Sequence, residues 1–191
     1  MEYLKDPGPE LDEFAPAPDP GDPKNVQEIR ERFKYKCVTL TGRRRARCSY
    51  TQACNTGFQG LSADSTKLAM WNLYKAGYVM ENVVHDETIT LLPFDRNLTA
   101  RAAHIQSIMV NSMRVLTPDV NVKAEPALMF RWAKSAEPYF ADDVLLPWEI
   151  VPRDREGHVV EWKDLSAFDK GRLRSRLEDM YDMAERLRTH G

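Results

Sequence analysis

Three consecutive polar residues, His85, Asp86 and Glu87, lie between two stretches of β-forming composition, YVMENVV and ETITLL. This pattern predicts a β-hairpin with the polar residues at or near its tip. A carboxylate carried by rigid strands suits a hard, oxygen-preferring cation such as Mg²⁺, which takes one or two carboxylates and keeps several waters. His, Asp and Glu are also ordinary turn residues, so the triplet alone leaves a plain polar turn open.

Two amides, Asn55 and Gln59, lie four residues apart in a stretch whose apolar residues recur at helical spacing. That separation puts both amides on one face of a helix. A neutral amide both donates and accepts hydrogen bonds, so it can contact purine N3 or pyrimidine O2 in a minor groove without requiring one base. The alternative interpretation is a polar pair that faces solvent.

A short basic run, Arg43-Arg44-Arg45, follows Gly42. Clustered guanidinium groups suit phosphate oxygens, although many charge runs are simply solvated. The formal net charge of the 191 residues is −2, so the chain as a whole carries no excess of positive charge. Any contact with nucleic acid must therefore come from a local patch such as this one.

The elements that position these residues follow from periodicity and turn signals. In chain order we expect a helix over 25–34 capped by Asn25, an extended KCVTL segment, a turn at Gly42, a helix over 49–76 ended by Gly77, the hairpin, a helix over 97–114 stopped by Pro118, and a strand at VNVKAE. Helices alternating with a few strands predict an α+β fold, in which an antiparallel sheet has helices packed on one face.

The two ends of the chain differ from this middle part. Residues 1–24 hold half of the prolines, mixed with Asp and Glu, and predict a disordered acidic arm. Residues 139–191 predict a loop followed by an amphipathic helix over 166–188, with an apolar stripe of Leu173, Leu177, Met180, Ala184 and Leu187. We expect this stripe to fold back on the chain's own core, and docking on a second subunit is the alternative. The expected segments are thus 1–24, 25–138 and 139–191.

The cysteine usage and the absence of an apolar run indicate a cytoplasmic protein. Cys37, Cys48 and Cys54 are odd in number and form no CxxC pair, which fits reduced thiols. No stretch is long and apolar enough to cross a membrane, and the first residues, MEYLKDPGPE, do not resemble a signal peptide.

Three segments, YKCVTLTGRRR, NTGFQGLSADSTKLAM and NVVHDETI, resemble in order and spacing the C-terminal part of family A DNA polymerases, the polymerase I type. That family has a Gly-Arg turn, a helix with Asn-x-x-x-Gln-Gly and Ala-Asp-x-x-Lys-Leu-Ala-Met, and then a His-Asp-Glu hairpin. The matching positions here are Gly42, Arg43, Asn55, Gln59, Gly60, Ala63, Asp64, Lys67, Leu68, Ala69, Met70, His85, Asp86 and Glu87. VNVKAEPALMFRW is similar to the family's closing strand and its tryptophan, here Trp132, so the resemblance covers about 25–135.

The resemblance implies the palm segment of a template-directed DNA polymerase. In this family's pattern Asp86 would be a catalytic metal ligand, Glu87 would support the metal site, and His85 would lie near the primer 3′ end. Asn55 and Gln59 would contact the minor groove, and Arg43, Arg44 and Arg45 would contact the DNA backbone or form structural ion pairs. The reaction implied is attack of a primer 3′-hydroxyl on the α-phosphate of a deoxynucleoside triphosphate, assisted by two Mg²⁺ ions.

Parts of the family pattern are missing. The second catalytic aspartate, in an Asp-Tyr-Ser-like strand, and the nucleotide-binding fingers helix have no counterpart, and Thr51 stands where the family commonly has arginine. One carboxylate cannot hold two Mg²⁺ ions, so we expect the isolated chain to be inactive. An upstream subunit with thumb, fingers and the second Asp would complete it, as in the split polymerases of some phages. The expected partners are that subunit, primer-template DNA and a deoxynucleoside triphosphate, in the cytoplasm of a bacterial or phage-infected cell.

Two other classes of function remain open at this point. The first is a non-catalytic DNA-binding remnant of a polymerase palm, which would keep Asn55, Gln59 and the arginines and bind a duplex without catalysing a reaction. An unrelated metal-dependent hydrolase would use His85, Asp86 and Glu87 together with a further cluster of ligands. His104 and His158 do not have the spacing expected of such ligands.

Overall fold

The computed structural model describes residues 2–5 and 35–190 of the chain. The expected helix over 25–34 and most of the acidic arm over 1–24 lie outside the described residues. The exception is Glu2–Lys5, which forms strand β1 and pairs with β2 (Tyr35–Val38) in an antiparallel ladder.

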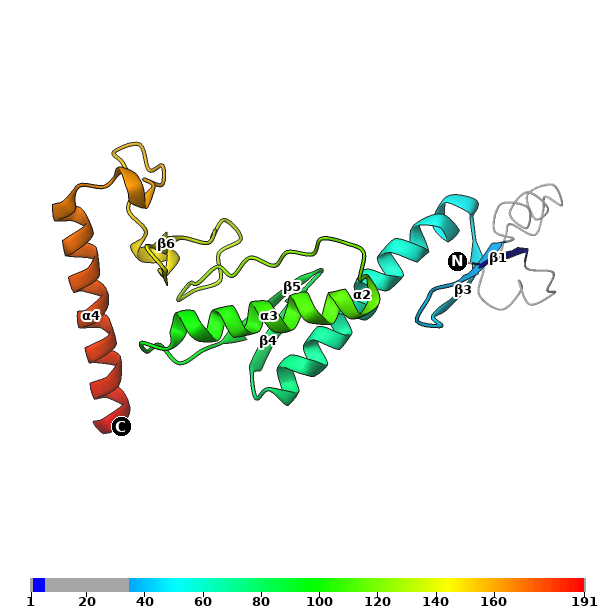
Figure 1. The fold of residues 1–191 in the computed structure, drawn as a ribbon, viewed down its shortest axis with the longest axis horizontal. Coiled ribbons are helices and arrows are strands. Elements are labelled where there is room, and N and C mark those ends of the chain that lie inside the picture. Colours follow the sequence, from blue (N-terminus) through cyan, green and yellow to red (C-terminus); the bar gives the residue numbers. More distant parts are fainter. Residues whose placement is uncertain (1, 6–34, 191) are drawn as a thin grey trace, which may run out of the picture. The chain divides into compact units, whose positions relative to one another are not determined.

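The fold is α+β, as the sequence predicts, and ends in a C-terminal helix (Figure 1). The described strands form three small antiparallel sheets. One has the order β1-β2-β3, with β3 at Arg44–Cys48. The second is the hairpin of β4 (Val79–Val84) and β5 (Glu87–Leu91), and the third pairs β6 (Phe140–Ala141) with β7 (Val144–Leu145).

The β2–β3 hairpin turns at Gly42, as expected, and contains a bulge. Gly42 has a left-handed φ of 83°, which an L-residue rarely adopts. Tyr35 pairs with Cys48 but Cys37 pairs with Arg45, so β3 has one more residue than β2 between these two pairs. Arg47, in the bulged stretch, has a φ of 54°. Bulges of this kind insert one residue and bend the strand.

Helix α2 (Tyr50–Lys75) confirms the expected helix over 49–76 almost to the residue. Its buried positions are mostly small side chains, namely Ala53, Thr56, Gly57, Gly60, Ser65, Ala69 and Leu73. The helix ends where Gly77 adopts a φ of 84°. The amide of Gly77 donates to the carbonyl of Tyr74, and the amide of Tyr78 donates to that of Leu73. These bonds satisfy carbonyl groups that the last turn leaves without helical partners.

Helix α3 (Leu98–Leu116) confirms the expected helix over 97–114. Leu98 and Ala102 are buried, and Ile105 and Met109 are half-buried, so the apolar face predicted from the sequence is the covered face. Asp95 stabilises the start of the helix. Its carboxylate accepts a hydrogen bond from the amide of Asn97 at 2.9 Å and forms an ion pair with Arg101 at 2.6 Å.

The strand expected at VNVKAE is not formed, which corrects that prediction. Within this stretch, residues 121–125 alternate between exposed and half-buried, as a strand would, but they have no strand partner. The carbonyl of Ala124 instead accepts the side-chain amide of Gln106 on α3 at 2.5 Å. Pro126 has no amide hydrogen to add to a ladder. Trp132, at the end of the same segment, is 56% exposed.

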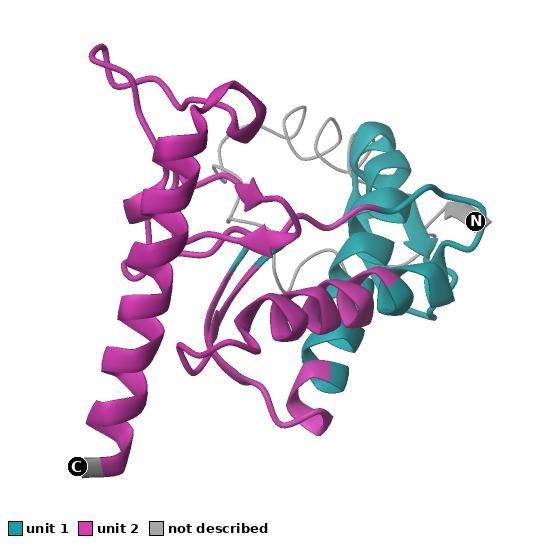
Figure 2. Cartoon of the chain, turned by 60° about the vertical axis from the view of Figure 1, so that its left-hand side comes forward, with its two compact units in different colours: residues 1–72, 84–87, 111–122 teal, residues 73–83, 88–110, 123–191 magenta. Residues whose placement is uncertain are grey.

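The chain forms two compact units, which Figure 2 shows in separate colours. The first comprises residues 1–72, 84–87 and 111–122, and the second comprises 73–83, 88–110 and 123–191. Helix α4 (Ala167–His190) lies in the second unit and confirms the helix expected over 166–188.

The second unit contains the larger core. Its buried members are Tyr139, Ala141, Leu146, Ile150, Val151, Leu177 and Tyr181, with Phe94, Trp148, Val159, Trp162 and Met180 packed against them. Phe94 contacts both Tyr181 and Phe130, with ring centroids 4.9 Å and 5.2 Å apart. The apolar face of α4 therefore folds back on its own unit through Leu177. Leu187 does not take part, because 71% of its surface is exposed.

One arginine, Arg96, adds a polar connection between the segment before α3 and helix α4. Its guanidinium pairs with Glu178 at 2.9 Å, Asp182 at 2.7 Å and Glu185 at 3.4 Å. The three carboxylates lie on one face of α4 at spacings of four and three residues. Among the described helices, none combines the length and apolar character needed to span a bilayer.

Candidate functional site

The His85-Asp86-Glu87 triplet lies at the tip of the β4–β5 hairpin, as the sequence predicts. Strand β4 ends at Val84 and β5 begins at Glu87, so His85 and Asp86 form the two-residue connection. All three side chains of the triplet are exposed. His85 has a φ of 57°, a left-handed conformation that histidine tolerates better than most residues. The two-residue turn therefore fixes the backbone that carries Asp86.

The carboxylate of Asp86 is available to an external ligand. It takes part in no ion pair with the described residues, and it is exposed. Such a side chain fits one oxygen ligand of a Mg²⁺ ion, which prefers carboxylates and retains several waters. Within the described part of the chain, the hairpin tip does not belong to any group of three or more close metal-ligating side chains. The tip can thus supply part of a metal site, and further ligands would have to come from elsewhere.

Asn55 and Gln59 are both exposed on the N-terminal half of α2, one turn apart. Phe58, between them in sequence, is 79% exposed. Residues 84–87 at the hairpin tip and residues 50–72 of α2 belong to the same compact unit, shown in teal in Figure 2. The structure therefore places the predicted carboxylate and the two predicted amides in one unit, although far apart in sequence.

Arg43 is bound within this unit. Its guanidinium forms an ion pair with Asp64 on α2, including a bond from Nε at 3.1 Å, and Thr41 donates a hydrogen bond to the same carboxylate. These hydrogen bonds, first from Arg43 and then from Thr41, lower the pKa of Asp64 below its ordinary value. Arg43 thus forms a structural ion pair, one of the two roles expected for it.

A close contact accompanies the ion pair. A Cβ atom built on Gly60 would lie 2.8 Å from the Cγ2 of Thr39, which is nearer than real side chains approach. Thr39 is 4% exposed, and its hydroxyl accepts the amide of Arg43 at 3.2 Å. The Gly42 turn and α2 can approach this closely only because residue 60 is glycine.

The other two arginines of the run differ from Arg43. Arg45 donates from Nη1 to the hydroxyl of Thr56 at 3.1 Å. Arg44 is exposed, and it makes no ion pair with the described residues. Of the three arginines, Arg44 is therefore the one whose guanidinium is best placed to meet an outside anion. The sequence alone does not reveal this difference, because three adjacent arginines look equivalent until their strand register is known.

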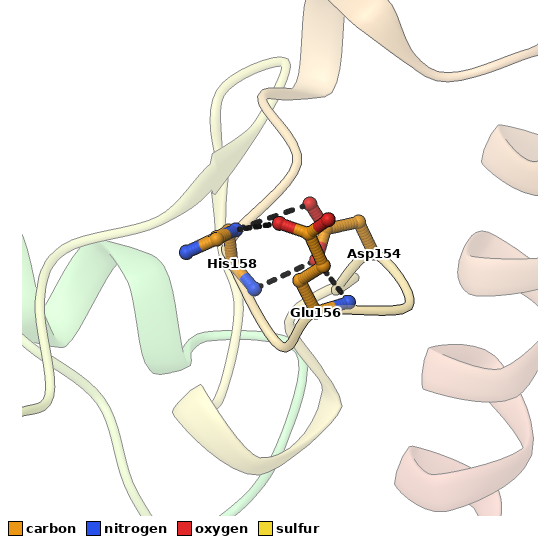
Figure 3. Close-up of side chains that lie close together, drawn as sticks. All are labelled: Asp154, Glu156 and His158. Carbon is orange, nitrogen blue, oxygen red and sulfur yellow. Dashed lines mark hydrogen bonds and ion pairs between the residues drawn. The ribbon is translucent and has the colours of Figure 1, made fainter.

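A group of ligand-type side chains that sequence reasoning missed occurs in the loop before α4. Asp154, Glu156 and His158 bring their ligand atoms within 4.8 Å of one another (Figure 3). The Nδ1 of His158 lies 3.4 Å from Asp154 and 3.6 Å from Glu156, and all three side chains are exposed. Their i, i+2, i+4 spacing was the available signal.

This loop group is explained by the turn that it forms. The carboxylate of Asp154 accepts the amides of Glu156 and His158 at 2.9 Å each. The amide of His158 gives the largest effect that lowers the pKa of Asp154. Gly157, with a φ of 91°, completes the turn. The carboxylate of Asp154 therefore accepts hydrogen bonds from the backbone of its own turn, as an aspartate in a tight turn commonly does.

Comparison with known proteins gives one relevant similarity. The chain is 30% identical over 118 residues to DNA polymerase I of Aquifex aeolicus (strain VF5), an alignment that covers 56% of the chain and 20% of that protein. The chain thus spans about a fifth of the length of the curated relative that it matches. No family model matches the chain, and no solved structure matches it. More than half of the chain is accordingly similar to part of a DNA polymerase.

Proposed function

We propose that the chain is the C-terminal part of a template-directed DNA polymerase of family A and adds nucleotides to a primer 3′ end together with an upstream subunit. The observation that carries this proposal is the presence, in one compact unit, of an exposed carboxylate at a hairpin tip and of two exposed helix amides. The similarity of part of the chain to a DNA polymerase I supports the same proposal.

In this proposal each residue has a defined role. Asp86 binds a divalent cation, Glu87 supports the site from the next position, and His85 lies near the primer 3′ end. Asn55 and Gln59 hydrogen-bond to the minor groove, where acceptors common to all base pairs allow contact without sequence preference. Arg44 meets a backbone phosphate, whereas Arg43 and Arg45 hold the β2–β3 hairpin on α2. Mg²⁺ would stabilise the attacking and leaving oxygens when bound.

The upstream subunit is required because this chain offers too few ligands. Two Mg²⁺ ions repel each other and need carboxylates from more than one strand. The hairpin supplies Asp86 and Glu87, and the helix that would bind the deoxynucleoside triphosphate has no counterpart in the sequence. The partner would bring thumb, fingers and the second catalytic aspartate. This arrangement corresponds to a split polymerase of the phage type.

The proposal is tested by mixing the purified chain with the candidate upstream subunit and measuring primer extension with Mg²⁺. We expect extension from the mixture and none from either chain alone. Asp86→Ala should lower the extension rate on the order of a hundredfold to a thousandfold, as removal of a group that stabilises the transition state does. Asp119→Ala is the matched control, because Asp119 is an exposed turn residue of the same unit.

Two results would contradict this function. Extension by the chain alone would remove the need for a partner. A mixture that extends primers equally well with Asp86→Ala would exclude the hairpin carboxylate from the chemistry.

The alternative is a non-catalytic DNA-binding remnant of a polymerase palm. The incomplete ligand set at the hairpin tip favours this second candidate. It predicts that the double substitution Asn55→Ala and Gln59→Ala weakens duplex binding, whereas Asp86→Ala has no effect on any measurable activity. Duplex binding measured by fluorescence anisotropy, beside the extension assay, separates the two functions.

A further inference from the structure

Helix α4 carries an uneven distribution of charge. Its first eleven residues, 167–177, contain four basic side chains and one acidic one, Asp169. From Glu178 onward it contains four acidic and two basic side chains before His190. Three of those four acids are already paired with Arg96. The positive charge of α4 is therefore concentrated in its first half.

Two of the four basic residues have partners within the unit. Arg174 forms an ion pair with Asp142, and its guanidinium lies 5.4 Å from the ring centre of Trp162. Lys170 lies over the same ring at 5.6 Å. These contacts attach the first half of α4 to the neighbouring loop, so they have a structural explanation.

Arg172 and Arg176 have no such explanation. Both are exposed, and neither forms an ion pair with the described residues. They lie four residues apart and so project from one face of the helix, where like charges destabilise it slightly. The buried residues Leu177 and Tyr181 define a different face. The arginine pair thus opposes helix formation slightly and contributes nothing to the core.

An exposed aromatic residue extends the same line by one turn. Phe168 is four residues before Arg172, and 76% of its surface is exposed. We call Phe168, Arg172 and Arg176 the α4 stripe. Ser175 and Asp179 lie beside the stripe on the same face of the helix. A phenylalanine in water next to two unpaired guanidinium groups presents a flat apolar surface beside positive charge.

This combination fits one class of ligand better than others. The two arginines are separated by about 6 Å along the helix axis, and a nucleic acid strand carries a phosphate about every 3.4 Å of its length. That separation corresponds to about two phosphate steps, so both guanidinium groups can reach phosphates of one strand. An exposed ring adds a stacking surface, which is useful only where a base face is accessible, as in a single strand. A duplex, with its bases stacked inside, would use the arginines but not Phe168.

We propose that the α4 stripe binds single-stranded DNA, with Arg172 and Arg176 on phosphates of the same strand and Phe168 stacked on a base. Such a ligand is present during the proposed function as the uncopied template strand. In that respect the inference rests on the polymerase proposal, whereas binding of a single strand by the stripe can be measured without it.

The test is fluorescence anisotropy of a labelled single-stranded oligothymidylate titrated with the full chain at several salt concentrations. Arg172→Gln with Arg176→Gln should weaken binding at least about tenfold and reduce the slope of log K against log salt by about 1.4, the value for two lost phosphate contacts. Phe168→Ala should weaken binding roughly fivefold or more, while Phe168→Trp should bind at least as well as the parent chain. All positions are exposed, so thermal unfolding should be unchanged.

Matched controls separate this site from general attraction of anions. Arg155→Gln with Arg186→Gln removes the same charge from two other exposed arginines of this unit and should leave most of the affinity. Equal losses in both double variants would overturn the proposal. So would an equal effect of Phe168→Ala on binding of a duplex or of poly-L-glutamate, or failure of the parent chain to bind the oligonucleotide.

Failure of the single-strand binding proposal can be distinguished from failure of the polymerase proposal. Asp86→Ala should abolish primer extension with the partner but leave oligothymidylate binding intact. The double variant Arg172→Gln with Arg176→Gln should still bind duplex DNA. It should reduce primer extension more on templates with long single-stranded overhangs than on templates with short ones. If extension fails in every mixture while the stripe still binds single strands, only the polymerase assignment is lost.

Discussion

In the unit that contains α4, seven buried side chains from Tyr139 to Tyr181 form one apolar core, with Phe94 packed against them. In the unit that contains the hairpin tip, the corresponding cluster has three small members, Cys37, Cys48 and Ala53. The latter unit relies instead on the Arg43–Asp64 ion pair and on the close approach of Gly60 to Thr39. Among the residues that the structure describes, it therefore has less apolar burial to stabilise it than the unit without the proposed catalytic residues.

The difference indicates how each unit obtains its stability. A protein that binds a partner or DNA only in its folded state gains stability from that binding. The hairpin-tip unit carries most of the proposed DNA contacts, so it is the unit that such binding would stabilise. The three cysteines are free, and burial is the first cause that raises the pKa of Cys48, so this buried thiol acts as a small apolar side chain.

The largest effect is expected in the aromatic core. Leu177→Ala should lower the free energy of unfolding by about 2–5 kcal/mol, because it leaves a cavity beside Tyr181. Urea unfolding followed by the fluorescence of Trp148 and Trp162 measures it. Leu187→Ala on the same helix is the control and should change stability by less than about 0.5 kcal/mol, since Leu187 is exposed. Similar losses from the two substitutions would mean that α4 does not bury Leu177.

A smaller effect is expected where the β2–β3 turn meets α2. Gly60→Ala should destabilise the chain by about 1–3 kcal/mol, because the new methyl group would overlap with the buried Thr39. Thermal unfolding followed by circular dichroism measures the change.

The matched control is Gly171→Ala in α4, where an added Cβ meets no atom within 4 Å. Alanine has the higher helix propensity, so this change should stabilise by up to about 1 kcal/mol. Opposite signs at the two glycines support the close contact in the hairpin-tip unit. Stabilisation at both would show that the turn does not approach α2 at Gly60.

The smallest effect concerns the Arg43–Asp64 pair and its dependence on pH. The pKa of Asp64 is lowered from 3.8, first by Arg43 and then by Thr41. A carboxyl group with a lowered pKa in the folded state stabilises that state above pH 3.8, and this contribution is lost as the pH falls further toward the folded-state pKa. Asp64→Asn should therefore flatten the acid side of the curve of melting temperature against pH, with the parent chain as reference. An unchanged acid limb would indicate that the pair is not formed in solution.

The elements of the fold were largely predictable because their signals are local. Apolar residues at helical spacing predicted α2, α3 and α4, and Gly77 marked the end of α2. The hairpin followed from two β-forming runs around a polar pair. Strand β1 was not predicted, since a short segment in a proline-rich stretch gains a strand conformation only through its long-range pairing with β2.

Long-range contacts limited what could be said of the site. The alternating pattern of VNVKAE predicted a strand, but pairing needs a neighbour, and the side chain of Gln106 takes the carbonyl of Ala124 instead. Arg43, Arg44 and Arg45 look alike in sequence, yet their partners across β3 and α2 give them different roles. The roles of Asp86, Asn55 and Gln59 in catalysis and DNA contact stay predictions, because their ligands are outside this chain.

The position of Phe94 has a consequence for biosynthesis. Its core partner Tyr181 follows 87 residues later, since 181 − 94 = 87. At about 5–20 residues per second, a ribosome adds that stretch in roughly 4–17 s. Throughout this interval the apolar side chain of Phe94 awaits its covering helix, a period in which a nascent chain is open to chaperones.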